Sequence, residues 1–127
     1  MKAWKDNPVF ENSKAFAVSI INLYKYLVDV KHESVLAKQV LRSGTSIGAN
    51  LRESINAQSS LDFINKLNIA LKEADETLYW LELLYETKYI SNDQFLSLNG
   101  DCRNLISALT KVIIIKKKQE EEKKKKK

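Results

Sequence analysis

The chain has 127 residues, of which 21 are lysine or arginine and 16 are acidic, and its formal net charge is +5. One cysteine and one histidine exclude an internal disulfide and a Cys–His zinc cluster. No apolar run approaches the ~20 residues that a membrane span needs, and the N-terminal segment lacks the apolar stretch of a signal peptide. We therefore expect one soluble, cytoplasmic domain with no cofactor, no metal and no membrane partner.

The positive charge is concentrated at the C-terminal end. Residues 116–127 hold eight lysines and three glutamates, which leaves 13 basic and 13 acidic residues in 1–115. A neutral body argues against a uniformly basic nucleic-acid module. We divide the chain into a domain over 1–115 and a charged tail over 116–127.

Three glycines and one proline are too few for a fold of many strands, which needs a turn about every 8–12 residues. Apolar residues instead recur at helical spacing, and we expect helices at about 13–29, 34–56, 61–89 and 93–116. Long helices with short turns predict an all-α, up-down-up-down four-helix bundle. Lys/Glu pairs four residues apart in the tail favour continuation of the last helix.

The expected helices each contribute to one buried core. Following Pro8, Asn12 or Ser13 is the expected cap of the first helix. The residues expected to be mostly buried are Phe16, Leu27, Leu36, Ile47, Leu67, Leu71, Leu78, Leu98, Leu105 and Leu109.

Three cations share one face of the second helix. At 100° per residue, Arg42 and Arg52 lie about 40° on either side of Lys38, and all three lie opposite the apolar side. Cations spaced along one face, with small neighbours, are typical of phosphate binding. The alternative is an ordinary solvated face.

The second helix also carries small residues beside this stripe. Gly44 and Gly48 indicate close approach by another helix, either within the chain or from another subunit. A polar stripe on the other flank is expected to form interhelical hydrogen bonds and close packing, and comprises Gln39, Ser43, Ser46, Asn50 and Ser54.

The sequence offers no catalytic constellation. A serine triad built on Ser43 or Ser46 lacks a base, because His32 is the only histidine and lies outside this helix. A di-iron site needs two Glu-x-x-His pairs, which a chain with one histidine cannot supply. Cys102 falls in the apolar stripe of the last helix, where we expect a buried hydrophobe.

The third helix has a second apolar patch formed by Ile69, Trp80 and Leu83, away from its main stripe. A helix that is apolar on two sides contacts two partners. We expect this patch, or the Gly44/Gly48 flank, to contact another subunit. The alternative is a scattered exposed set, or a Trp80 folded under the last helix.

The segment QVLRSGTSIGANLRE resembles the four-helix-bundle proteins encoded in intervening sequences of 23S ribosomal RNA genes. A second block, residues 62–84, is similar to the third helix of that family, and the resemblance covers about residues 9–113 without the tail. The positions that match the family signature in the first block are Gln39, Arg42, Ser43, Ser46, Ile47, Asn50 and Glu53.

The resemblance implies a left-handed bundle and, in several members, a ring-shaped homopentamer without enzymatic activity. It also suggests association with nucleic acid, because the related accessory proteins of diversity-generating retroelements bind nucleic acid and a reverse transcriptase through a basic pentamer surface. The body of this chain departs from that pattern by being neutral.

Together these patterns predict a non-catalytic homo-oligomer that binds RNA or DNA weakly and without sequence preference. Lys38, Arg42 and Arg52 are the expected phosphate contacts, and the lysine-rich tail adds nonspecific attraction. The alternative is an oligomeric scaffold whose partner is another protein and for which nucleic-acid binding is incidental.

Overall fold

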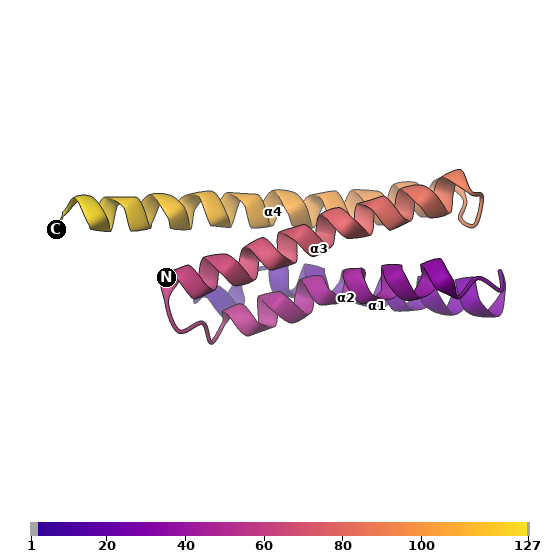
Figure 1. Cartoon of the computed structure of the whole chain (residues 1–127), viewed down its shortest axis with the longest axis horizontal. Helices are drawn as coiled ribbons and strands as arrows, with labels where there is room; N and C mark the ends of the chain where they lie inside the picture. The colour runs from indigo at the N-terminus through magenta and orange to yellow at the C-terminus, as the bar shows by residue number, and fades with distance from the viewer. Residues whose placement is uncertain (1–2, 127) are drawn as a thin grey trace.

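The computed structural model describes residues 3–126, which form four α-helices preceded by one 3-10 turn and contain no strand (Figure 1). Successive helices run antiparallel, so the expected all-α, up-down-up-down four-helix bundle is confirmed. The elements are η1 (Trp4–Asp6), α1 (Val9–Asp29), α2 (Val35–Ser54), α3 (Ser60–Glu86) and α4 (Asn92–Lys125).

The last helix continues from the bundle into the charged tail, as the sequence predicted. Its 34 residues span about 51 Å at 1.5 Å per residue, and α4 projects past the other helices in Figure 1. Residues 1 and 2 of the expected domain and Lys127 of the expected tail lie outside the described residues. No helix within residues 3–126 combines the length and apolarity needed to cross a bilayer.

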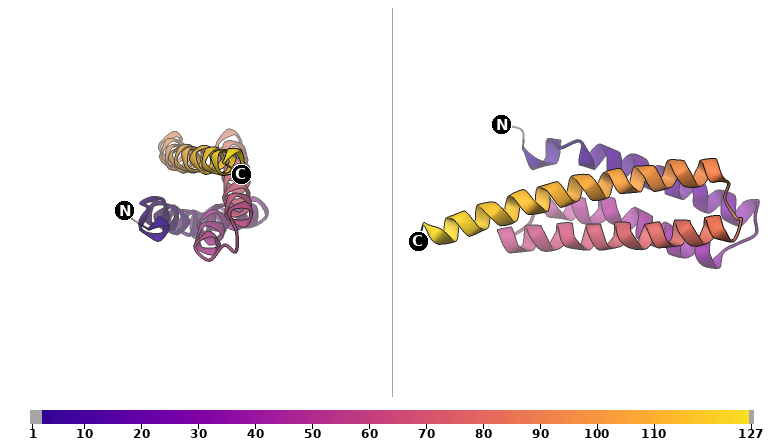
Figure 2. Two further views of the ribbon diagram at one scale, coloured as in Figure 1. Left: turned by 90° about the vertical axis from the view of Figure 1, so that its left-hand side faces the viewer. Right: turned by 90° about the horizontal axis from the view of Figure 1, so that it is seen from above.

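The four helices do not close evenly around the core. Helix α1 packs on α2, α2 on α3 and α3 on α4, whereas α1 and α4 share much less contact. The end-on view in Figure 2 shows the ribbons of α1 and α4 lying apart. A shallow groove of about 250 Å³ runs along this edge, lined in part by Asn12, Ser19 and Asn104.

The first helix begins at Val9, four residues before the expected start at residue 13. Pro8 stands at the N-cap, and the side-chain oxygen of Asn7 accepts a hydrogen bond from the backbone N–H of Val9 at 2.9 Å. Proline is tolerated at a helix start because the N–H it lacks has no intrahelical partner there. The expected cap at Asn12 or Ser13 is therefore wrong.

An aromatic cluster closes the end of the bundle where the chain begins. The Trp4 ring packs edge-on against Phe10 and Phe63, with centroid distances of 5.0 and 5.3 Å. The indole N–H of Trp4 donates to the Ser54 hydroxyl at 2.8 Å. These contacts join η1 to α1, α2 and α3, so the segment before residue 13 belongs to the bundle.

The core agrees with the apolar stripes. Leu36 and Leu71 are half-buried and pack against the buried cluster. The expected core residues that are buried are Phe16, Leu27, Ile47, Leu67, Leu78, Leu98, Leu105 and Leu109.

Local capping explains the other helix ends. The Glu33 carboxylate accepts from the first backbone N–H groups of α2, and Ser59 caps α3. Ser91 and Gln94 form a reciprocal capping box at the start of α4. Lys88 adopts a left-handed conformation with φ of 67°, which ends α3 three residues before the expected boundary.

The two glycines of α2 face α1 within the same chain. A Cβ on Gly44 would lie 2.8 Å from Cγ1 of Ile20, and one on Gly48 would lie 3.3 Å from the Ser13 hydroxyl. Of the two uses expected for these glycines, the structure shows close helix approach within the chain. Gly44 is buried and Gly48 is half-buried, and the expected contact of this flank with another subunit stays a prediction.

Gly44→Ala should destabilise the fold by about 1–3 kcal/mol, because the β-branched and fully buried Ile20 cannot move away from the added methyl group. Gly100→Ala is the matched control, since no atom beyond its own helix backbone and chain neighbours lies within 4 Å of its Cβ position. Alanine should stabilise α4 there by about 0.5–1 kcal/mol. Urea unfolding measures both, and a stabilised Gly44→Ala would contradict the close-approach interpretation.

Candidate nucleic-acid interface

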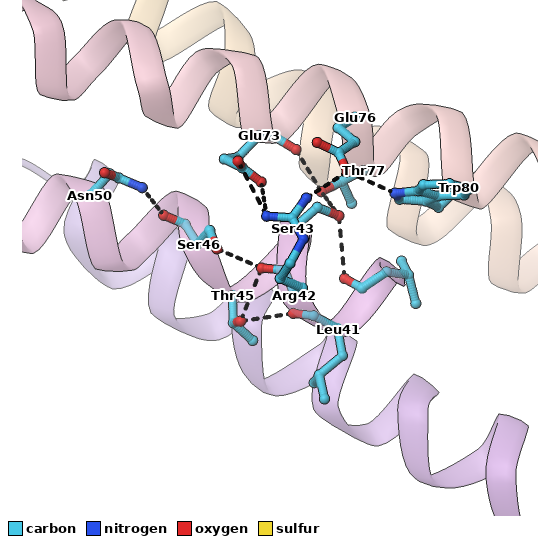
Figure 3. Close-up of polar contacts among 11 residues, drawn as sticks. Leu41, Arg42, Ser43, Thr45, Ser46, Asn50, Glu73, Glu76, Thr77 and Trp80 are labelled. Carbon is cyan, nitrogen blue, oxygen red and sulfur yellow. Dashed lines mark hydrogen bonds and ion pairs between the residues drawn. The ribbon is translucent and has the colours of Figure 1, made fainter. Parts of the chain in front are cut away.

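Arg42, one of the three cations expected to bind phosphate, points toward α3 (Figure 3). One guanidinium nitrogen lies 3.1 Å from a carboxylate oxygen of Glu73, and the other lies 2.5 Å from Glu76. The N–H of Trp80 donates to the same Glu76 oxygen at 3.3 Å. The charge of Arg42 is therefore matched by two carboxylates of the next helix.

These contacts shift the titration of both partners. The hydrogen bond to Glu76 is the main cause that raises the pKa of Arg42, and the same hydrogen bond lowers the pKa of Glu76. A phosphate would have to displace two carboxylates from Arg42. We therefore assign Arg42 to the contact between α2 and α3, and its expected role as a phosphate ligand stays a prediction.

Glu76→Gln should destabilise the chain near neutral pH by less than about 1 kcal/mol, because the Arg42–Glu76 pair is solvent-exposed. The lowered pKa of Glu76 means that this stability is present above its unfolded-state pKa. It is lost as pH falls through the lower folded-state pKa.

The difference between wild type and Glu76→Gln should thus vanish in acid. Urea unfolding at a series of pH values measures it, with Glu82→Gln, an exposed acid of the same helix, as the control. A difference that grows as pH falls would contradict the assignment.

Two residues of the expected polar stripe of α2 form hydrogen bonds to other elements. The hydroxyls of Ser43 and Thr77 are both fully buried and lie 2.9 Å apart, so they form an interhelical hydrogen bond. Ser54 accepts from Trp4. Ser46 and Asn50 instead bond to backbone carbonyls of α2 itself, as Figure 3 shows. The interhelical role is therefore shown for Ser43 and Ser54.

The other two expected cations are solvent-exposed. Neither Lys38 nor Arg52 forms an ion pair with any residue between 3 and 126. Arg52 lies at the edge of a groove between α1 and α2, whereas Arg42 lies on the side of α3. The predicted stripe of cations on α2 is thus divided: Arg42 lies at the contact with α3, and Arg52 lies at the groove with α1.

The groove between α1 and α2 has a volume of about 550 Å³. Lys5, Lys14 and Arg52 line it together with one acid, Glu11, and all four side chains belong to exposed residues. Sequence reasoning missed Lys5 and Lys14 because it considered each helix alone. Because α1 and α2 run antiparallel, residues near the start of α1 lie beside the end of α2. This pairing is the signal that could have identified the two lysines.

The second apolar patch of α3 is exposed in part. Ile69 is 43% exposed, while Trp80 and Leu83 are half-buried, and Trp80 packs against the core. Glu73 and Glu76 stand between Ile69 and Trp80 along α3 at helical spacing, so they lie on the same face. The patch is therefore interrupted by the acids that bind Arg42.

The C-terminal part of α4 passes the beginning of α3. The Lys116 ammonium lies 5.7 Å from the centre of the Phe63 ring, and the nearby Ser60 side chain lowers the pKa of Glu120. The lysines that follow, from Lys117 to the C-cap Lys126, are exposed. They form a basic surface at this end of the chain.

The other two candidate reactive groups, Cys102 and His32, show no arrangement typical of catalysis in the described chain. Cys102 is fully buried, and burial raises the pKa of its thiol to about 12. A thiol with this pKa is a poor nucleophile at neutral pH. His32 lies in the turn before α2 with a positive φ of 55°. Within residues 3–126, no three metal-ligating side chains cluster together.

The family model for the 23S rRNA-intervening sequence protein matches residues 5–111. The chain belongs to this family. A search of curated proteins gives no match. Among solved structures, the chain is similar to a protein of unknown function from the S23 ribosomal protein family of Bacteroides thetaiotaomicron. The two chains share 58% identity with a TM-score of 0.82, over 83% of this chain and 97% of that one.

Proposed function

We propose that this family member is a cytoplasmic, non-catalytic bundle that binds RNA or DNA weakly through phosphate contacts and without sequence preference. One observation supports the proposal above the others. The exposed lysines beyond Lys116 are carried by a continuous helix that projects from the bundle, so they form an extended and ordered basic surface. Such a surface attracts a polyanion regardless of its base sequence.

Within the body, Lys38 and Arg52 are the proposed phosphate contacts retained from the α2 stripe. Both are exposed, and neither has a carboxylate partner in the part of the chain that the structure describes. The acids of α3 neutralise Arg42 instead. The body therefore contributes few contacts, and most of the attraction comes from α4.

Deletion of residues 116–127 should weaken binding to a random-sequence RNA and lower the salt dependence of binding without abolishing it. Each lost phosphate contact reduces the slope of log K against log salt by about 0.7 for a single strand. Fluorescence anisotropy at several salt concentrations measures the slope. An unchanged affinity after the deletion would contradict the role of α4.

The double variant Glu121→Gln, Glu122→Gln is a control of opposite sign. Both acids are exposed on the same projecting helix, and their loss makes this part of α4 more positive. The affinity should therefore rise, most clearly at low salt. Weakened binding by this variant would show that helix structure rather than charge controls the affinity.

The second candidate function is an oligomeric scaffold that binds another protein, and the exposure of Ile69 and Tyr79 on α3 favours it. Exposed apolar side chains beside an aromatic anchor such as Trp80 are typical of interfaces. We propose a homo-oligomer in either case, with five copies as the family resemblance implies and with Ile69, Trp80 and Leu83 at the contact.

Ile69→Lys should reduce the molar mass measured by light scattering at tens of micromolar protein, because a charge at a packed subunit contact lacks a partner. Ile69 is preferable to Trp80 for this test because Ile69 is exposed, so its replacement should leave the core of the fold intact. Val35→Lys, at a residue that is 70% exposed on α2, is the control and should leave the mass unchanged. A wild-type monomer would exclude the proposed assembly.

A further inference from the structure

The α1–α2 groove is concave and has small residues in its walls. The weak phosphate contacts of the proposed function need neither feature. Its volume of about 550 Å³ falls within the usual range of small-molecule sites, about 300–1,000 Å³. Small residues, Ala17, Gly48 and Ala49, line its walls and leave the space between the helices open. A flat basic surface would bind phosphates equally well, so the concave shape requires its own explanation.

The charged residues of the groove favour an anion. Lys5, Lys14 and Arg52 face one acid, Glu11, and none of them forms an ion pair among residues 3–126. By contrast, Arg42 on the other side of α2 is paired with two carboxylates. The cations of the groove are therefore available to a ligand without the loss of an existing contact.

The other lining groups favour a ligand that is more than an anion. Phe10 and Ile55 provide apolar surface, and the Glu11 carboxylate is a hydrogen-bond acceptor. Thr45 also lines the groove, and because its hydroxyl donates its proton to the Leu41 carbonyl at 2.7 Å, its oxygen can serve a ligand only as an acceptor. Inorganic phosphate has no apolar part and would use only the cations.

We propose that the groove binds one nucleotide of a single-stranded nucleic acid. The phosphate lies against Lys14 and Arg52, and the base lies on the apolar surface of Phe10 and Ile55. A base N–H and the ribose hydroxyl of the nucleotide donate to Glu11 and Thr45. A nucleotide has an anionic group, a flat apolar ring and hydrogen-bond donors together, which matches all three parts of the lining.

The same geometry disfavours a duplex. In a duplex the bases are stacked and paired, and only the backbone is available to a groove between two packed helices. A single strand can turn one base out of its stack and place it on an apolar or aromatic side chain. We therefore expect the groove to prefer a single strand over a duplex of equal length at the same salt concentration.

This inference rests on the proposed function and adds a binding site to it, so its test uses variants that affect only the groove. The full chain is titrated into a fluorescein-labelled uridine decamer and into a duplex of the same length, with anisotropy as the readout. Ala49→Leu fills the groove without a change of charge. The double variant Lys14→Gln, Arg52→Gln removes two of the three groove cations and keeps polar side chains in their place.

Each variant has a matched control outside the groove. Ala15→Leu makes the same change at an exposed alanine on the α4 side of α1. Lys25→Gln with Lys111→Gln removes two exposed cations from α1 and α4. Alanine and leucine both favour helices, so these variants should fold, and thermal unfolding verifies this.

Ala49→Leu should remove the preference for the single strand and leave the salt slope unchanged. The Lys14/Arg52 double variant should weaken single-strand binding about tenfold and lower the slope by about 1.4, while the controls change affinity less than threefold. If both groove variants bind like their controls while the wild type binds, the groove inference is wrong and the proposed function stands. If the wild type binds neither probe at low salt, both fail.

Discussion

The close packing of α1 against α2 is the contact on which the rest of the structure depends. Gly44 leaves room for Ile20, which is fully buried, and Gly48 leaves room for Ser13. This approach fixes the rotation of α2 about its own axis. The rotation decides which residues of α2 enter the core, which face α3 and which line the outer groove with α1.

The rotation of α2 also separates its cations. Arg42 lies on the α3 side, where Glu73 and Glu76 match its charge, and Lys66 lies 3.9 Å from Glu53 across the same contact. Arg52 instead lines the groove with the cations of α1. The neutral composition of the body thus hides an uneven arrangement, with charges paired between α2 and α3 and positive charge in excess between α1 and α2.

Helix positions and the fold class could be predicted from the sequence because the apolar stripes repeat at helical spacing over most of the chain. The start of α1 could not, because the apolar pattern favours a cap at Asn12 or Ser13, whereas the Asn7 side chain caps a helix that begins directly after Pro8. The candidate site was predicted only in part. A helical wheel places Arg42 and Arg52 near each other, but it does not show which neighbouring helix lies beside each residue.

Photo-crosslinking of a single-stranded decamer that contains 4-thiouridine, followed by mass spectrometry, tests the central claim that nucleic acid enters the α1–α2 groove. The crosslink forms only where a base touches the protein, so it separates a base-binding groove from long-range attraction by α4. We predict crosslinked peptides that contain Phe10 and residues 45–55. Crosslinks confined to α3 or to the end of α4 would contradict the account.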